Sequence, residues 1–104
     1  AFLDIHPVQP GHVLVIPKKQ IDRLEDLDDA NYKHLMDIVK KLMRHLRETL
    51  STERITLKIE GFDVPHAHVH LIPCNEARDF WSKVRMDSPI DPPALQEMHK
   101  KLAL

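Results

Sequence analysis

Residues 65–72 read PHAHVHLI, and this stretch decides how the rest of the chain is interpreted. Three histidines, His66, His68 and His70, stand at every second position. Alternate side chains of a strand share one face, so an extended segment would present the three imidazoles together. The residues between and after the histidines are small or apolar: Ala67, Val69 and Leu71. The pattern predicts a strand with one face in the core, packed against a helix, and one histidine face.

Two uses of a histidine face involve no catalysis. Zinc–nitrogen bonds are about 2.1 Å long, whereas same-face neighbours of a strand stand about 6.6 Å apart and the outer two histidines about 13 Å apart. Three imidazoles in a row would therefore share one ion only across a sharp bend, which disfavours a metal site. Polar histidines on a solvated sheet face are the other alternative.

Catalysis is the third use. Neutral imidazole is a nucleophile near pH 7, and mutual repulsion disfavours protonation of all three rings together. We expect one nucleophile, one neighbour that orients it and one cationic neighbour that attracts an anionic substrate such as a phosphate ester. Phosphoryl and nucleotidyl transfer need little beyond in-line positioning and charge stabilisation.

Composition limits the classes of protein that fit. A chain of 104 residues with 15 Lys and Arg against 16 Asp and Glu fits one small domain, and nothing in this charge balance indicates a nucleic-acid or membrane partner. No apolar run is long enough to span a bilayer. The single cysteine, Cys74, excludes an intramolecular disulfide and agrees with a reducing, cytoplasmic location. The chain begins at AFLDI without Met, and we expect further residues to precede it.

Two strands precede the histidine segment. The apolar runs FLDIH (2–6) and HVLVIP (12–17) predict an antiparallel pair, with Pro10-Gly11 suited to the centre of a type II turn and Pro17 ending the second strand. The alternation in RITLKIE (54–60) predicts a half-buried strand. We expect the histidine strand to end at Pro73 and residues 74–93 to be irregular.

A long helix lies between these strands. Asp28 or Asp29 is expected to cap it, and its length is roughly 20 residues. One apolar stripe follows its helical period: Tyr32, Leu35, Met36, Val39, Leu42, Met43, Leu46 and Leu50. A short C-terminal helix is expected from Pro93, with Leu95, Met98 and Leu102 on its apolar side. The predicted fold class is α+β: an antiparallel sheet with one long helix packed on it.

The stretch PHAHVHLIP, together with FLDIHPVQPGHVLVIPKK upstream, resembles the histidine triad (HIT) superfamily over about residues 2–73. The resemblance implies a hydrolase or transferase that acts on the α-phosphate of a nucleoside phosphoramidate or related nucleotide conjugate. The intermediate would be a nucleotidyl-histidine on His68. His66 would hold His68, His70 would contact a phosphate oxygen or the leaving group, and His12 would support the triad from the neighbouring strand.

The resemblance also implies a nucleotide pocket and a dimer. Asp4 matches the carboxylate that binds ribose hydroxyls, and Leu3 and Ile5 match residues that line the base pocket. The segment KIEGFDVPH departs from the family, because Phe62 replaces a usual Gln and Asp63 replaces a phosphate-binding Ser or Thr. Asp63 is thus expected beside the nucleotide, where its charge would repel an α-phosphate.

The expected molecule is one HIT-like domain over residues 1–104, without the family's N-terminal strands and without a metal or other cofactor. By resemblance, two copies would pair through the long helix and an adjoining strand. Two rival functions stay open: a nucleotide-binding module without catalysis, favoured by Phe62 and Asp63, and a metal-binding protein.

Overall fold

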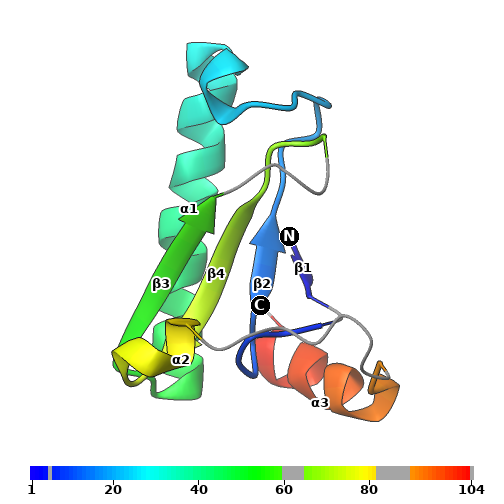
Figure 1. Ribbon diagram of the computed structural model, residues 1–104, viewed down its shortest axis with the longest axis vertical. Coiled ribbons are helices and arrows are strands. Elements are labelled where there is room, and N and C mark those ends of the chain that lie inside the picture. The colour runs from blue at the N-terminus through cyan, green and yellow to red at the C-terminus, as the bar shows by residue number, and fades with distance from the viewer. Residues whose placement is uncertain (5, 60–64, 82–89, 104) are drawn as a thin grey trace.

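Four antiparallel strands form the sheet of this protein, whose computed structural model describes residues 1–4, 6–59, 65–81 and 90–103 (Figure 1). The strands are β1 (Phe2–Leu3), β2 (Val13–Val15), β3 (Arg54–Ile59) and β4 (Val69–Cys74), in the spatial order β1-β2-β4-β3. The long helix α1 (Asp29–Leu50) packs on one face of this sheet. The predicted α+β fold is confirmed.

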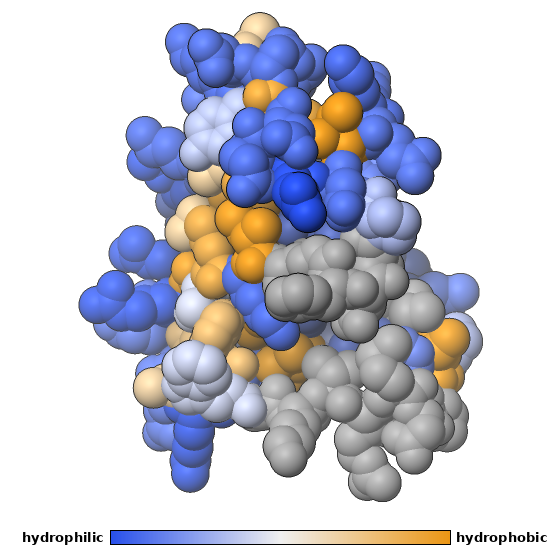
Figure 2. Space-filling model, turned by 45° about the horizontal axis from the view of Figure 1, so that its top comes forward, coloured by the Kyte–Doolittle hydropathy of each residue, from blue (hydrophilic) through white to orange (hydrophobic). Residues whose placement is uncertain are grey.

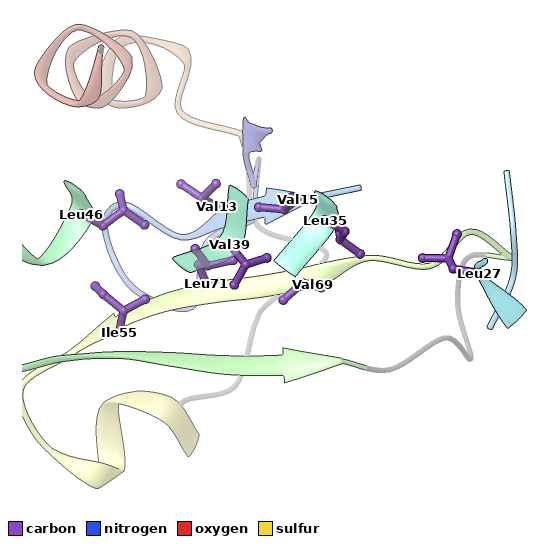
Figure 3. Close-up of a cluster of buried hydrophobic side chains, with 9 residues drawn as sticks. All are labelled: Val13, Val15, Leu27, Leu35, Val39, Leu46, Ile55, Val69 and Leu71. Carbon is purple, nitrogen blue, oxygen red and sulfur yellow. The ribbon is translucent and has the colours of Figure 1, made fainter. Parts of the chain in front are cut away.

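Helix α1 and the sheet enclose the core. The Asp28 carboxylate accepts a hydrogen bond from the Asn31 N–H and caps the helix, as expected. The core cluster, drawn in Figure 3, combines residues from α1, three strands and the loop before α1: Val13, Val15, Leu27, Leu35, Val39, Leu46, Ile55, Val69 and Leu71. The predicted stripe on α1 is confirmed from Leu35 onward, whereas Tyr32 at the first turn is exposed.

The β1–β2 connection holds a position that only glycine suits. Gly11 has φ +86°, which agrees with the predicted type II turn. A Cβ atom at this position would lie 2.6 Å from Cδ1 of Leu50 in the last turn of α1. The turn before His12 is therefore pressed against the end of the helix. Strand β2 ends at Val15, two residues before Pro17.

Strand β4 differs from the predicted histidine strand at both ends. It begins at Val69, so His66 and His68 lie in the extended segment before it. It also continues through Pro73, which pairs with Ile55 of β3. The register with β2 reaches only to Leu71, so Pro73 has a strand partner on one side. A proline without an N–H is tolerated where one side of a strand carries no ladder.

Three short helices complete the described chain: a 3₁₀ turn (Leu24–Asp26), α2 (Ala77–Trp81) and α3 (Pro92–Leu102). Helix α2 packs against β4, within the segment that we expected to be irregular. Helix α3 confirms the predicted C-terminal helix; it is capped by Asp91 and lies against α1, where a His45 ring nitrogen bonds the Leu102 carbonyl.

On the face shown in Figure 2, hydrophilic side chains surround smaller apolar areas. No helix within the described residues combines the length and the apolar character needed to cross a membrane.

Candidate active site

The sheet register divides its side chains between two faces. One row of paired residues crosses all four strands: Phe2, Leu14, His70 and Lys58. The next row is Leu3, Val13, Leu71 and Leu57. Val13 and Leu71 belong to the core beneath α1, so the second row faces the helix and the first row faces away from it. The face opposite α1 is therefore the histidine face, as the sequence predicts.

His68 is fixed by the main chain beside it. A ring nitrogen, Nδ1, lies 2.7 Å from the carbonyl oxygen of His66, and only an N–H can donate to that oxygen. Nδ1 of His68 therefore carries the proton of the neutral ring, and Nε2 carries the lone pair. His68 is only 8% exposed, so its ring is also restricted by packing.

His66 and Ala67 join this segment to the loop that follows β2. Nε2 of His66 lies 2.9 Å from the Pro17 carbonyl oxygen, and the Ala67 N–H donates to the Ile21 carbonyl. Both bonds anchor the chain just before His68. The structure thus places His66 as a support of His68 through the main chain, although neither residue lies in a strand.

A second hydrogen-bonded chain runs through His12 and His70. The Val8 N–H donates to Nδ1 of His12 over 3.1 Å, which requires the proton of a neutral His12 ring to be on Nε2. Nε2 of His12 lies 2.9 Å from Nδ1 of His70. His12 therefore donates and His70 accepts, which leaves the His70 proton on Nε2. Nε2 of His70 is buried and has no hydrogen-bond partner among the residues described.

Burial keeps both rings of this chain neutral near pH 7. Desolvation is the largest cause that lowers the pKa of His12. Desolvation, followed by the charges of His12, His68 and Lys58, lowers the pKa of His70 to about 4. Asp4 opposes these effects in both rings. The expected cationic neighbour of the nucleophile is therefore neither His12 nor His70. Lys58 brings positive charge to the histidine face instead.

Asp4 lies beside this chain at the end of β1. Its Oδ2 is 3.6 Å from Nε2 of His12, its Oδ1 accepts the His6 N–H, and its own N–H donates to the His12 carbonyl. The predicted ribose-binding carboxylate thus lies near the triad, on the β1 side.

Of the remaining predicted pocket residues, only Leu3 lies within the part of the chain that the structure describes. Leu3 lies in the row that faces the core, so its expected contact with a base is not supported by the register. Phe2 is its neighbour on the histidine face and is 49% exposed. Ile5, Phe62 and Asp63 lie outside the described residues. The sequence reading missed Phe2 and Lys58, because only the strand register shows that they share a row with His70.

Asp4, His12 and His70 also form the one group of possible metal ligands found in the described part of the chain, with ligand atoms within 4.8 Å of one another. A metal on Nε2 of His12 would require its proton to move to Nδ1, which already accepts the Val8 N–H. The hydrogen-bond pattern therefore favours a chain of neutral imidazoles over a metal centre.

The resulting arrangement suits substitution at phosphorus. A nucleophilic lone pair on His68 and an N–H donor on His70 are carried by rings whose centroids are 4.9 Å apart. The first can attack an electrophilic phosphorus while the second donates a hydrogen bond to one of its oxygens.

Comparison with known proteins agrees with this geometry. The family model described as HIT domain matches residues 1–77. The chain is 37% identical over 82 residues to the asymmetrical bis(5'-nucleosyl)-tetraphosphatase of Schizosaccharomyces pombe, covering 74% of this chain and 45% of that protein. It is 39% identical over 74 residues to an adenosine 5'-monophosphoramidase of Saccharomyces cerevisiae, covering 70% of this chain and 47% of that protein. The chain thus matches less than half the length of these two curated relatives.

A solved structure matches over more of the chain. The HIT-like protein involved in cell-cycle regulation from Bartonella henselae superposes with a TM-score of 0.80 at 28% sequence identity. The match covers 96% of this chain and 74% of that structure.

Proposed function

This chain belongs to the HIT domain family, and from that membership we propose that it is a nucleotide hydrolase or nucleotidyl transferase acting through a histidine-bound intermediate. The substrate would be a nucleoside phosphoramidate or a related nucleotide conjugate, such as a dinucleoside polyphosphate. Two neighbouring rings carry this proposal. His68 has its proton on Nδ1, which leaves the lone pair on Nε2, and His70 has an Nε2–H without a partner among the described residues.

In the proposed reaction, Nε2 of His68 attacks the α-phosphorus. An N–P bond forms, the bond to the leaving group breaks, and its electron pair stays on the leaving atom; a leaving amine also takes up a proton from the solvent, whereas a leaving phosphate departs as an anion. The His66 carbonyl stabilises the positive charge that develops on the His68 ring, because it accepts the Nδ1–H. Water then attacks the same phosphorus and releases a proton to the solvent, the N–P bond breaks with its electrons returning to Nε2, and a nucleoside monophosphate is released.

Four other residues at or beside the histidine face have roles in this proposal: His70, His12, Asp4 and Phe2. His70 donates its Nε2–H to a phosphate oxygen, and His12 keeps that proton in place by donating to Nδ1 of His70. Asp4 accepts hydrogen bonds from the ribose, and Phe2 offers an exposed ring for the base to stack on. Both positions lie toward β1, so the nucleoside would bind on that side of His70.

A chromogenic adenosine 5'-phosphoramidate tests the mechanism. We expect His68→Ala to lower kcat by at least about 10³-fold, and acid-quenched mass spectrometry of the wild type to find one adenylyl group on the peptide containing His68. His34→Ala, which removes an exposed histidine on α1, is the matched control and should leave the rate unchanged. Turnover that survives in His68→Ala would refute the mechanism. Tight AMP binding with neither product nor adduct would favour a non-catalytic nucleotide-binding module.

We also propose that residues 1–104 act as one unit that pairs into a two-fold dimer through α1 and β3. β3 is an outer strand of the described sheet. A groove between β3 and the C-terminal half of α1 is lined by four basic and two acidic side chains: Lys40, Arg44, Arg47, Arg54, Glu48 and Glu53. Acidic residues cluster around the start of α1: Asp22, Glu25, Asp26, Asp28 and Asp29. An antiparallel helix pair would place each acidic end against the partner's basic end.

Sedimentation equilibrium tests this pairing. Arg47→Glu should weaken the dimer, and Lys33→Glu, at an exposed position near the acidic end, should affect it less. A wild-type protein that stays monomeric at tens of micromolar would contradict the pairing. The cytoplasmic location stays a prediction.

A further inference from the structure

Lys58 occupies a position on the histidine face that the proposed mechanism does not yet use. It is the residue of β3 paired with His70 of β4 in the register. Directly opposed residues of antiparallel strands have Cβ atoms about 4.5–5.5 Å apart on the same face. The Lys58 side chain is exposed, so its ammonium group can reach a ligand bound over His70.

The order of strands fixes which part of a nucleotide Lys58 would meet. Phe2 and Asp4 lie on or beside β1, His70 lies on β4, and Lys58 lies on β3 beyond it. Neighbouring strands are about 4.8 Å apart. With the nucleoside over β1 and the α-phosphorus at His68 and His70, the groups beyond that phosphorus extend toward β3.

The protonation of the site is the second, independent observation. Because Nδ1 of His70 accepts a hydrogen bond from His12, His70 is neutral and holds a single proton, on Nε2. It can donate a hydrogen bond but has no surplus proton for a leaving group. An amine must gain a proton to depart in its neutral form, whereas a phosphate departs as an anion and needs only positive charge nearby.

We propose that Lys58 binds the phosphates beyond the α-phosphorus and makes this site selective for nucleotides with a phosphate or polyphosphate leaving group over those with an amine leaving group. In the step concerned, the N–P bond to His68 forms and the Pα–O bond breaks. The electron pair stays on the departing oxygen, whose negative charge Lys58 stabilises, and no proton is transferred. This proposal rests on the proposed nucleotidyl-transfer function and specifies its substrate class.

The positive charge of Lys58 also acts on the histidines. Burial is the larger cause of the lowered pKa of His12 and His70, and the charge of Lys58 lowers both further, in agreement with its place opposite His70 in the register. A cation that disfavours protonation of His70 favours a bound anion at the same place by the same Coulomb interaction.

Two substrates that share adenosine and the α-phosphate test the proposal: diadenosine tetraphosphate and adenosine 5'-phosphoramidate. We expect Lys58→Gln to lower kcat/KM about 10- to 100-fold for the tetraphosphate and less than about 3-fold for the phosphoramidate. Lys58→Arg should retain most of the tetraphosphate activity. Lys33→Gln, an exposed lysine on α1, should change neither. Equal losses on both substrates, or no loss on the tetraphosphate, would overturn the assignment.

Binding distinguishes failure of this proposal from failure of the proposed function. In a His68→Ala background, which cannot form the intermediate, calorimetry would compare AMP with ATP. We expect ATP to bind about 10-fold more tightly than AMP, and Lys58→Gln to remove that difference while leaving AMP binding unchanged. Equal affinities for AMP and ATP before the Lys58 substitution would refute the role of Lys58, whatever the kinetics show. Absence of turnover with both substrates in the wild type would refute the enzymatic function alone.

Discussion

Nε2 of His12 lies 2.9 Å from Nδ1 of His70, and the Val8 N–H on the other side of the His12 ring fixes the direction of that hydrogen bond. A main-chain N–H can only donate, so the tautomers of both rings follow from one backbone donor. The position of the N–H that His70 would offer to a substrate therefore depends, through His12, on Val8 in the β1–β2 connection. In the proposed mechanism, His12 acts through His70 as a positioning residue.

Replacing His12 should remove the hydrogen bonds that join Val8, His12 and His70. In His12→Ala, Nδ1 of His70 loses its donor, and the ring can adopt the tautomer with its proton on the wrong nitrogen. We expect kcat to fall about 10- to 100-fold with little change in KM. The acid limb of the kcat profile should also move to higher pH, because the charge of His12 contributes to the lowered pKa of His70. His34→Ala serves as the control, and an unchanged pH profile in His12→Ala would contradict the positioning role.

The lowered pKa values predict a loss of stability in mild acid. Both His12 and His70 have a lower pKa in the folded protein than the ordinary value of 6.5, which we take for the unfolded chain. Above pH 6.5 neither state binds a proton at these rings. As the pH falls toward 4, the unfolded state binds protons first and the fold is destabilised, by less than about 1.4 kcal/mol per pH unit for each ring, since partial exposure screens the effect.

Urea unfolding at pH 7.0 and pH 5.0 measures this dependence. His70→Gln should be less sensitive to acid than the wild type, because one of the two titrating rings is absent. A free energy of unfolding that rises from pH 7.0 to pH 5.0 would have the wrong sign for buried neutral histidines.

Phe2 and Leu3 offer a matched pair for locating the base. Phe2 lies on the histidine face and Leu3 packs toward the core. We expect Phe2→Ala to weaken AMP binding by about 1–2 kcal/mol, in the range of aromatic stacking on a base, with stability nearly unchanged. Leu3→Ala should instead lower the free energy of unfolding by about 1–2 kcal/mol. Calorimetry and urea unfolding of both variants would separate the effects, and the reverse outcome would restore Leu3 as the base contact.

Gly11→Ala should destabilise the protein and disturb His12. The positive φ alone costs about 1 kcal/mol for alanine, and the added Cβ would lie 2.6 Å from Cδ1 of Leu50. In the Gly11→Ala protein, a second substitution, Leu50→Ala, should remove the part of the destabilisation that comes from the steric clash and leave the part that comes from the positive φ. A double-mutant cycle measures the difference. Additive effects of the two substitutions would show that the contact does not limit the turn.

Local rules predicted most of the fold. The Asp28 cap, the α1 stripe from Leu35 and the Pro10-Gly11 turn each depend on a few neighbouring residues, so the sequence contains what determines them. Pro73 was placed wrongly because its tolerance depends on where β2 stops pairing with β4, which is a tertiary property. Helix α2 was missed because five residues are too few for a periodic pattern.

The site was predictable in its residue types and less so in its arrangement. The alternation of His66, His68 and His70 identified the face correctly, whereas the protonation of each ring depends on partners far along the chain, such as Pro17 for His66 and Val8 for His12. Burial, which also depends on tertiary structure, favours the neutral form of His12 and His70, so the expected cationic neighbour is neither of these two rings. The contributions of Phe2 and Lys58 required the strand register.

In the proposed mechanism, His68 forms the bond to phosphorus, whereas Lys58, in the same row of the sheet as His70, selects the leaving group. His68 bonds the His66 carbonyl, and the segment before His68 is anchored by hydrogen bonds to Pro17 and Ile21 in the loop after β2. A change at exposed position 58 would thus alter which compounds are cleaved while the attacking group is inherited intact. In this proposal, a single substitution at position 58 would reduce the preference for phosphate leaving groups without removing the histidine that attacks phosphorus.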